Sequence, residues 1–208
     1  MHANSSAVAR TLANHAPANA SDLAALVIDH LRTLIAHVRG DDTNSLRQFW
    51  RADEKKRQVP EIENTCRDAI LGMLRPELMK LSVQLEKEAS AANDTRADLR
   101  AVATVDSERV VVPIEIKKQE HKHLWTAWRD QLDGRYLTDP AAQGIGVYLV
   151  LWFGAELGAK LNPKSSSTGE RPRSAGELES MLRSVIPPAD RIRLSVVVLD
   201  LSLPVGPM

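Results

Sequence analysis

The sequence has one cysteine, no surplus of charge of either sign and no long apolar run. Cys66 by itself excludes an internal disulfide and a cysteine-based zinc cluster, and it fits a reducing cytoplasm. The 27 Lys and Arg residues balance 27 Asp and Glu residues, so a site for a polyanion must be local. The longest apolar run, 147–153, is far shorter than the roughly 20 residues of a membrane span, and no signal pattern is present. We therefore expect a cytoplasmic protein with no membrane partner.

The first part of the chain predicts a helical extension. Apolar residues recur at helical spacing over 21–39, between an N-cap at Ser21 and a stop at Gly40. We expect an N-terminal extension over 1–58, with this amphipathic helix, and a main domain over 59–208. The apolar face of the helix suits a homodimer contact or the docking of an upstream domain.

The main domain alternates helices and strands. Pro60 opens a helix that Pro76 kinks or ends, and we expect a further helical segment over 78–88. The remaining pattern predicts strands at 96–105 and 109–117, a helix at 121–136, a buried strand at 144–154, a helix at 175–185 and a strand at 191–203. The Gly-x-Gly before the buried strand is on the wrong side of it for a nucleotide-binding loop. An α/β fold is the prediction.

The strand around 110–118 carries two charges that need an explanation. Because side chains alternate along a strand, Glu115 and Lys117 share one face of an otherwise apolar segment. Burial of such charges is costly unless they are paired or bind an ion. A surface ion pair on a half-exposed strand is the simpler interpretation. Pro113 removes one backbone donor and predicts an edge position or a bulge.

A third charge approaches this pair if the two strands at 96–105 and 109–117 form a hairpin around 106–108. Asp98 then lies level with Glu115 and Lys117. Two carboxylates suit oxygen ligation of Mg²⁺, for which Mn²⁺ is a substitute, and a lysine can orient water or steady a phosphate. Metal-dependent hydrolysis of a phosphodiester uses such a set.

These residues resemble the motif of the PD-(D/E)XK nuclease superfamily over about residues 60–153. Asp98 stands at the motif aspartate, preceded by Ala97 instead of proline, and Glu115 and Lys117 fill the Glu-x-Lys positions. The resemblance implies a restriction-endonuclease-like core in helix-strand-strand-helix-strand order, with a mixed central β-sheet flanked by helices. It places the metal at the split edge of that sheet.

The resemblance also implies further site residues. An acid from the first core helix would join Asp98 and Glu115 as a metal ligand, and Glu63 is the candidate, with Glu61 second. Gln131 and Tyr136 fall where the family adds a glutamine and a tyrosine. The segments 63–68, 96–98, 113–117, 124–125, 131–132 and 148–154 also resemble a bacterial subgroup in which this module ends a larger protein.

The expected function is therefore a Mg²⁺-dependent nuclease that acts on nucleic acid, DNA more than RNA. Phosphate contacts would come from local cations, which are Lys118, Lys122, Arg129 and Arg135. The alternative is a catalytically silent nuclease-fold module that binds nucleic acid or mediates protein interaction or dimerisation. A transition-metal site at His121 and His123 is disfavoured, because residues two apart do not share a helix face.

Overall fold

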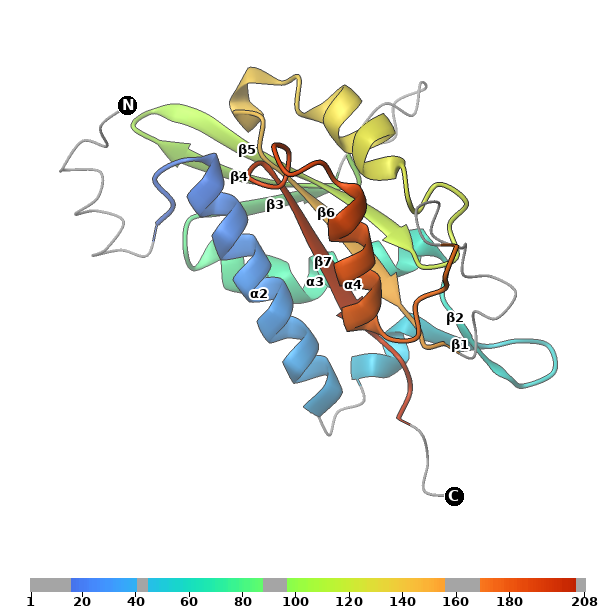
Figure 1. The fold of residues 1–208 in the computed structure, drawn as a ribbon. Helices are drawn as coiled ribbons and strands as arrows, with labels where there is room; N and C mark the ends of the chain where they lie inside the picture. Colours follow the sequence, from blue (N-terminus) through green and yellow to red (C-terminus); the bar gives the residue numbers. More distant parts are fainter. Residues whose placement is uncertain (1–15, 41–44, 88–96, 156–168, 205–208) are drawn as a thin grey trace.

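A mixed sheet of five strands forms the centre of the protein, shown in Figure 1 as a computed structural model that describes residues 16–40, 45–87, 97–155 and 169–204. The strands lie side by side as β3 (Gln84–Lys87), β4 (Leu99–Val105), β5 (Glu108–Lys118), β6 (Gly146–Trp152) and β7 (Leu194–Asp200). β3, β4 and β5 are antiparallel neighbours, whereas β5, β6 and β7 are parallel. The predicted α/β fold with a mixed central sheet is confirmed.

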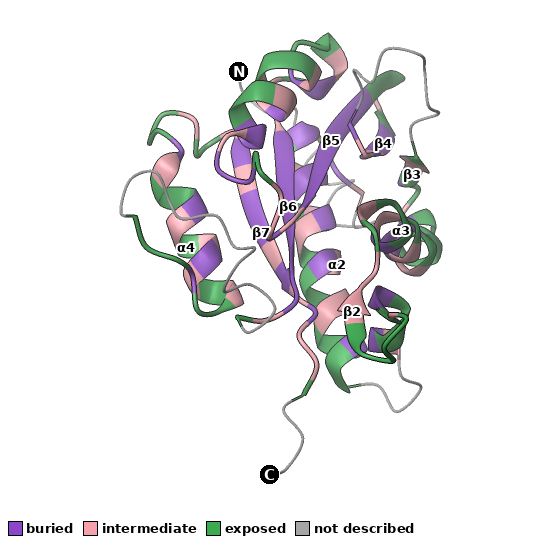
Figure 2. Cartoon of the chain, turned by 90° about the vertical axis from the view of Figure 1, so that its right-hand side faces the viewer, coloured by how far each residue is buried: buried purple, intermediate pink, exposed green. Residues whose placement is uncertain are grey.

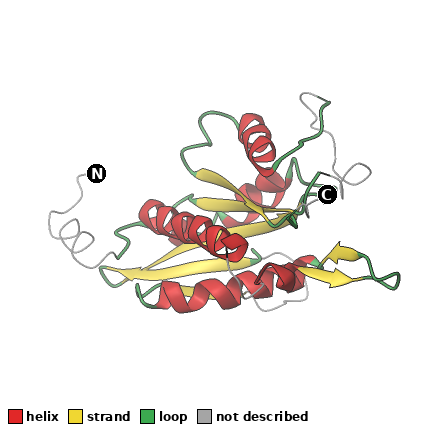
Figure 3. Cartoon of the chain, turned by 90° about the horizontal axis from the view of Figure 1, so that it is seen from below, coloured by secondary structure: helices red, strands yellow, loops and turns green. Residues whose placement is uncertain are grey.

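Helices cover both faces of this sheet (Figure 3). The helices α2 (Ala20–Gly40) and α3 (Glu63–Met79) share one buried cluster with alternate residues of β5 and β6. The π-helix η2 (Trp128–Tyr136) and α4 (Ala175–Val185) share a second cluster with the intervening residues of β6. Figure 2 shows β5 and β6 buried between these layers. Smaller elements are η1 (Ser45–Phe49), η3 (Pro140–Ala142) and a pair of short strands, β1 (Trp50–Ala52) and β2 (Gln58–Pro60).

The hairpin of β4 and β5 follows the predicted pairing. Its turn residues Asp106 and Ser107 have φ of 49° and 70°, the left-handed pair that matches the twist of two adjacent strands. The register runs without interruption from Val105↔Glu108 to Leu99↔Ile114. The predicted hairpin is confirmed, and this register sets Asp98 beside the end of β5.

The expected bulge at Pro113 is wrong, because β5 pairs with β4 in an unbroken register, whereas the expected edge position is confirmed locally on the side of β5 that faces β6. The Gln119 N–H donates to the Leu151 carbonyl of β6. The backbone groups of the odd-numbered residues of β5, including those of Pro113, therefore point toward the β6 side. Pairs with β6 begin only at Ile114. The missing N–H of Pro113 therefore lies just beyond the end of the parallel ladder, where no strand partner requires it.

The expected helix over 78–88 is also wrong, since residues 84–87 form β3 and pair with β4. The helix α3 continues past Pro76 to Met79, and Ser82, with φ of 58°, then reverses the chain. Val83 and Leu85 alternate into the core beside α3. Likewise only 128–136 of the expected helix at 121–136 is regular, and it is a π-helix.

The N-terminal helix packs into the same core as the sheet. Leu23, Val27 and Leu31 of α2 have no exposed surface and lie in one cluster with Ile114 and Ile116 of β5. The predicted boundary after residue 58 falls inside β2, which pairs with β1 across it. The two predicted regions therefore share one hydrophobic core. None of the described helices has both the length and the hydrophobicity needed to cross a bilayer.

Candidate functional site

The candidate site lies where β5 extends beyond the start of β4. The last pair between these strands is Leu99↔Ile114, so the following residues of β5 have no partner from β4. Carboxylates take that place: Asp98 Oδ2 accepts from the Ile116 N–H at 2.8 Å, and Glu63 Oε2 accepts from the Lys118 N–H at 3.2 Å. Two acidic side chains thus satisfy backbone donors of β5 that β4 leaves open.

The ammonium of Lys117 lies among three carboxylates. Its Nζ is 2.5 Å from Glu115 Oε1, 3.8 Å from Glu63 Oε1 and 3.9 Å from Asp98 Oδ2. It also donates to the Ile116 carbonyl at 3.0 Å. Only 7% of the Lys117 side chain and 3% of the Glu115 side chain are exposed, which excludes a surface ion pair. The structure therefore brings together four of the six residues to which the sequence assigned metal binding and catalysis.

Burial dominates the electrostatics of this cluster. It raises the pKa of Glu115 to about 7, with Asp98 and Glu63 adding to the rise and Lys117 opposing it. Burial raises the pKa of Glu63 as well, again with Asp98 adding to it and Lys117 opposing it. Burial alone would lower the pKa of Lys117, but the surrounding carboxylates outweigh it and raise this pKa. Glu115 Oε2 is buried and accepts no hydrogen bond from any described residue.

Arg67 is a neighbour of the site that the sequence interpretation left without a role. Its NH1 is 3.9 Å from Asp98 Oδ1, its Nε is 3.1 Å from Asp68 Oδ1, and 13% of its side chain is exposed. Arg67 follows Glu63 by four residues on α3, and this spacing places both on one helix face. This spacing is the sequence feature from which the position of Arg67 beside the site could have been predicted.

Two buried polar residues support the site from β5 and β6. Gln119 is 2% exposed; its Nε2 donates to the Gly154 carbonyl at 2.9 Å, and its Oε1 accepts from the Phe153 N–H. It thereby ties the chain after β5 to the end of β6. Tyr148 lies opposite Glu115 and donates its hydroxyl to the Leu124 carbonyl at 2.7 Å. Both residues stand within or beside apolar strands, where sequence patterns give no sign of their partners.

Gln131 and Tyr136 lie on η2, five residues apart, which is about one turn of a π-helix. This helix packs on the sheet face that includes Tyr148, the register neighbour of Glu115. Gln131 Oε1 is buried without a hydrogen bond to any described residue, and no described hydrogen bond or ion pair joins Gln131 to the cluster around Lys117. Tyr136 packs against the core beneath η2.

The predicted phosphate-binding cations divide into two groups. The Lys118 ammonium is 2.7 Å from Glu120 Oε1 and lies over the Phe153 ring, 5.5 Å from its centroid. Lys122, Arg129 and Arg135 are exposed on η2 and the turn before it. Arg129 Nε is 2.9 Å from Asp130 Oδ1, an exposed pair that solvent weakens.

The remaining metal candidates do not form a site in the described parts of the chain. Glu61, the second choice for the helix acid, lies 3.9 Å from Arg51 Nε instead of at the cluster. The rings of His121 and His123 are 5.7 Å apart and tilted. Within the described ranges, no three His, Cys, Asp or Glu side chains are arranged as a ready-made metal site. At the Lys117 cluster the ammonium occupies the space between the acids.

Comparison with known proteins identifies one family. Residues 22–155 match a domain of unknown function, DUF8371, over well more than half of the chain. The chain belongs to the DUF8371 family. The matched part of this DUF8371 protein includes α2 from residue 22 onward and all four residues of the cluster around Lys117. No curated protein and no solved structure matches it significantly.

Proposed function

We propose that this DUF8371 domain is a metal-dependent nuclease of the PD-(D/E)XK type that hydrolyses phosphodiester bonds, in DNA more than in RNA. One observation carries the proposal: carboxylates from α3, from the residue before β4 and from β5 converge on one buried lysine. They do so at the point where β4 and β5 separate. The restriction-endonuclease-like core is part of this proposal and is supported by the mixed sheet with helices on both faces.

The charge of the cluster supports a cation-binding role over a purely structural one. Glu63, Asp98 and Glu115 supply three negative charges when ionised, and Lys117 supplies one positive charge. Arg67 offsets part of the remainder from the outer side of Asp98. A structural ion pair needs one acid for one base, because each further buried carboxylate adds repulsion and desolvation. Once Glu115 has lost its proton, the surplus negative charge favours an additional cation.

The donor chemistry fits Mg²⁺ or Mn²⁺, which prefer carboxylate oxygens. Asp98 and Glu115, with Glu63, would hold the metal, which when bound polarises a phosphoryl oxygen and lowers the pKa of a bound water. The Lys117 ammonium must turn away from the acids for this to occur, and the freed group would contact a phosphate oxygen or orient the attacking water. The exposed cations Lys122, Arg129 and Arg135 would neutralise phosphates of the substrate. Lys118 would not contribute, because its ammonium pairs with Glu120.

A catalytically silent module is the second candidate. It is favoured by the contact of Lys117 with Glu115 and by the lack of a ready-made metal group among the described residues. In that case Lys117 neutralises the acids permanently, and the domain binds nucleic acid or another protein without cleavage.

Cleavage assays on plasmid DNA, linear DNA and RNA with Mg²⁺ or Mn²⁺ test the proposal. We expect Asp98→Asn and Glu115→Gln to lower the rate at least about 100-fold, as for loss of a group that acts on the reacting atoms. Glu77→Gln is the matched control, since Glu77 is an exposed acid on α3 that pairs with Lys80. Full activity in either site variant would overturn the assignment.

Calorimetry with Mg²⁺ separates the two candidates. The nuclease is supported if the wild type binds Mg²⁺ and if Glu115→Gln abolishes both this binding and cleavage. A wild-type protein that binds no Mg²⁺ or Mn²⁺ and cleaves no substrate supports the silent module.

A further inference from the structure

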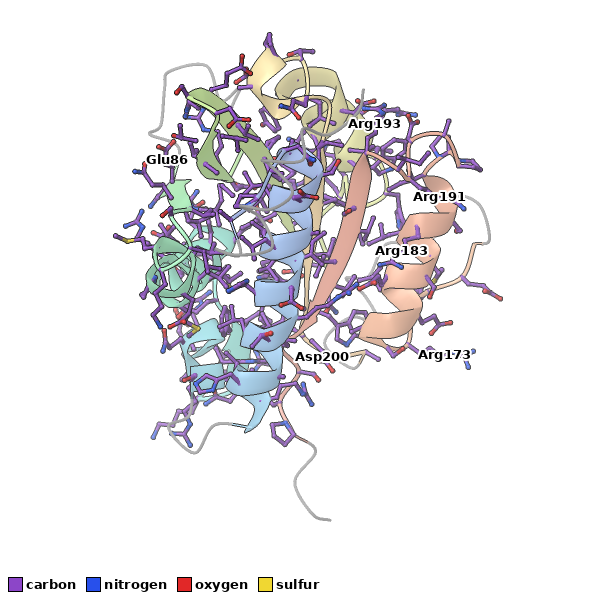
Figure 4. All side chains as sticks on the ribbon, turned by 90° about the vertical axis from the view of Figure 1, so that its left-hand side faces the viewer. Glu86, Arg173, Arg183, Arg191, Arg193 and Asp200 are labelled. Carbon is purple, nitrogen blue, oxygen red and sulfur yellow. The ribbon has the colours of Figure 1, made fainter. Side chains whose placement is uncertain are left out.

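The outer edge of β7 lies between α2 and α4 (Figure 4). It borders a pocket of about 520 Å³ that residues of these three elements line. On the inner side, the Leu201 N–H donates to the Trp152 carbonyl and the Arg193 carbonyl accepts from the Gly146 N–H. Odd-numbered residues therefore bond toward β6. Because the N–H and C=O of one strand residue point to the same side, even-numbered residues of β7 present their backbone groups outward.

Side chains of α4 cover part of this outer edge. Glu179 Oε2 accepts from the Val198 N–H at 3.0 Å, and Arg183 NH2 donates to the Val196 carbonyl at 3.3 Å. The two side chains also pair with each other at 2.7 Å. This ion pair stands where a further strand would lie, which is a known way of protecting a sheet edge.

Beside this cover, one step of the edge lacks a hydrogen-bond partner among the described residues, at Leu194 and Val196, which are each 2% exposed. The Leu194 N–H donates to the Asp190 carbonyl at 2.8 Å, but within the described ranges neither the Leu194 carbonyl nor the Val196 N–H bonds to another residue. Leu194, Ser195 and Val196 line the pocket. In a parallel pair, one residue of the neighbouring strand would donate its N–H to the Leu194 carbonyl and accept from the Val196 N–H. An antiparallel partner would instead compete with Arg183 for the Val196 carbonyl.

The charged lining of the pocket consists of Arg32, Arg183, Arg191 and Asp29. Because Glu179 pairs with Arg183, the excess positive charge comes from Arg32 and Arg191 against Asp29. Arg191 Nε donates to the Ile186 carbonyl at 2.8 Å, which fixes its guanidinium at the end of α4. Arg32 is exposed and forms no hydrogen bond or ion pair with another described residue. The ligand should therefore be acidic. A phosphodiester has no donor for the Leu194 carbonyl, whereas a peptide backbone supplies both a donor and an acceptor.

From these observations we propose that the edge of β7 binds an extended acidic peptide segment of a partner protein, parallel to β7 and opposite Ser195. Main-chain hydrogen bonds would hold the peptide, as in other cases of strand addition. Its acidic side chains would contact Arg32 and Arg191. The site uses β7 and not β5, so it does not depend on the proposed nuclease activity.

Fluorescence anisotropy with a fluorescein-labelled heptapeptide of alternating valine and glutamate tests the proposal. We expect binding that weakens at least about tenfold in Arg32→Glu, because the charge that meets the peptide is reversed. Lys55→Glu, an exposed reversal near the turn between β1 and β2, is the matched control and should bind as the wild type does. Equal binding of a peptide with lysine in place of glutamate would overturn the proposal.

Amide NMR gives a readout that charge alone would not move. In the free protein the Val196 N–H should exchange faster than the Val198 N–H, which Glu179 holds. The heptapeptide should slow exchange at Val196 and leave Val198 unchanged. The proposal fails if exchange at Val196 is unaffected, if an oligothymidylate displaces the peptide through Arg32 without that protection, or if Arg32→Glu instead abolishes a dimer of the free protein.

Discussion

At the scale of single residues, the cluster around Lys117 depends on the ionisation of Glu115. Its pKa is about 7 in the folded chain, against an ordinary value of 4.5, and burial is the main cause. The folded protein therefore holds this proton over a pH range in which the unfolded chain has lost it. Stability and metal binding should both respond to pH in that range, in opposite directions.

The first prediction concerns stability. A raised carboxyl pKa contributes stability that is complete below pH 4.5 and is lost as the pH rises toward about 7. The free energy of unfolding should therefore fall across that window by on the order of 3 kcal/mol more in the wild type than in Glu115→Gln. Denaturant unfolding of both proteins between pH 4.5 and 8 measures the difference. Parallel curves would contradict the assigned pKa.

The second prediction concerns Lys117. Lys117→Met leaves the three carboxylates without their ammonium, so the variant should be less stable than the wild type in EDTA. Mg²⁺ should raise its Tm by more than it raises that of the wild type, because the metal no longer competes with Nζ. Lys118→Met is the control, since Lys118 pairs with Glu120 outside the cluster. An equal Mg²⁺ shift in all three proteins would argue against metal ligation by these acids.

At the scale of elements, the packing of η2 on β6 depends on a glycine. A Cβ added to Gly146 would lie 2.9 Å from Leu137 Cδ2 and 3.0 Å from Leu132 Cδ1, both at the ends of side chains. A methyl group added where β6 begins beneath the π-helix would therefore force these two leucine side chains to shift. By contrast, a Cβ at Gly72, in α3, meets no atom within 4 Å.

The third prediction uses this contrast. Gly146→Ala should lower the free energy of unfolding by about 1–3 kcal/mol through overpacking. Gly72→Ala should raise it by about 0.5–1 kcal/mol, because alanine favours a helix interior. Urea denaturation of the two variants checks both signs. A stabilised Gly146→Ala protein would show that the Leu132 and Leu137 side chains move to accommodate the added methyl group at little cost.

Helices and strands could be predicted from the sequence where the local pattern favours the same secondary structure that tertiary packing stabilises. The turn at Asp106 and Ser107 and the alternation on either side were sufficient for the hairpin. β3 was missed because its four residues offer too short a period to distinguish a strand from the end of a helix. The spacing of apolar residues over 121–136 did not distinguish the π-helix from an ordinary α-helix, because both place apolar side chains on one face at similar intervals.

At the scale of the whole molecule, α2 joins the two parts that the sequence divided. Its buried side chains pack on the sheet beside β5, and the DUF8371 match begins within this helix. An amphipathic helix has the same pattern of apolar residues whether it packs on a second chain or on the sheet of its own chain. Only the fold shows which surface covers it.

The fourth prediction follows from that packing. Deletion of residues 1–39 should unfold the protein, because it exposes the apolar surface that Leu23, Val27 and Leu31 cover. Leu31→Ala alone should cost about 2–5 kcal/mol, as for a fully buried leucine. Circular dichroism of the truncated chain and thermal unfolding of the point variant measure both. A truncated protein that still folds would show that the core does not depend on α2.

The sequence by itself determined the α/β class, the hairpin and the alignment of Asp98 with Glu115 and Lys117, because those features follow from periods and turn residues close together in the chain. The position of Glu63 beside Asp98 was expected only from the family resemblance. The tertiary structure alone decided that Arg67 approaches Asp98, that the buried ammonium of Lys117 lies among the three carboxylates, and that one step of the β7 edge beside basic side chains lacks a partner among the described residues. These depend on contacts between segments that are distant in sequence, where burial and charge are set by the surroundings and not by the local pattern.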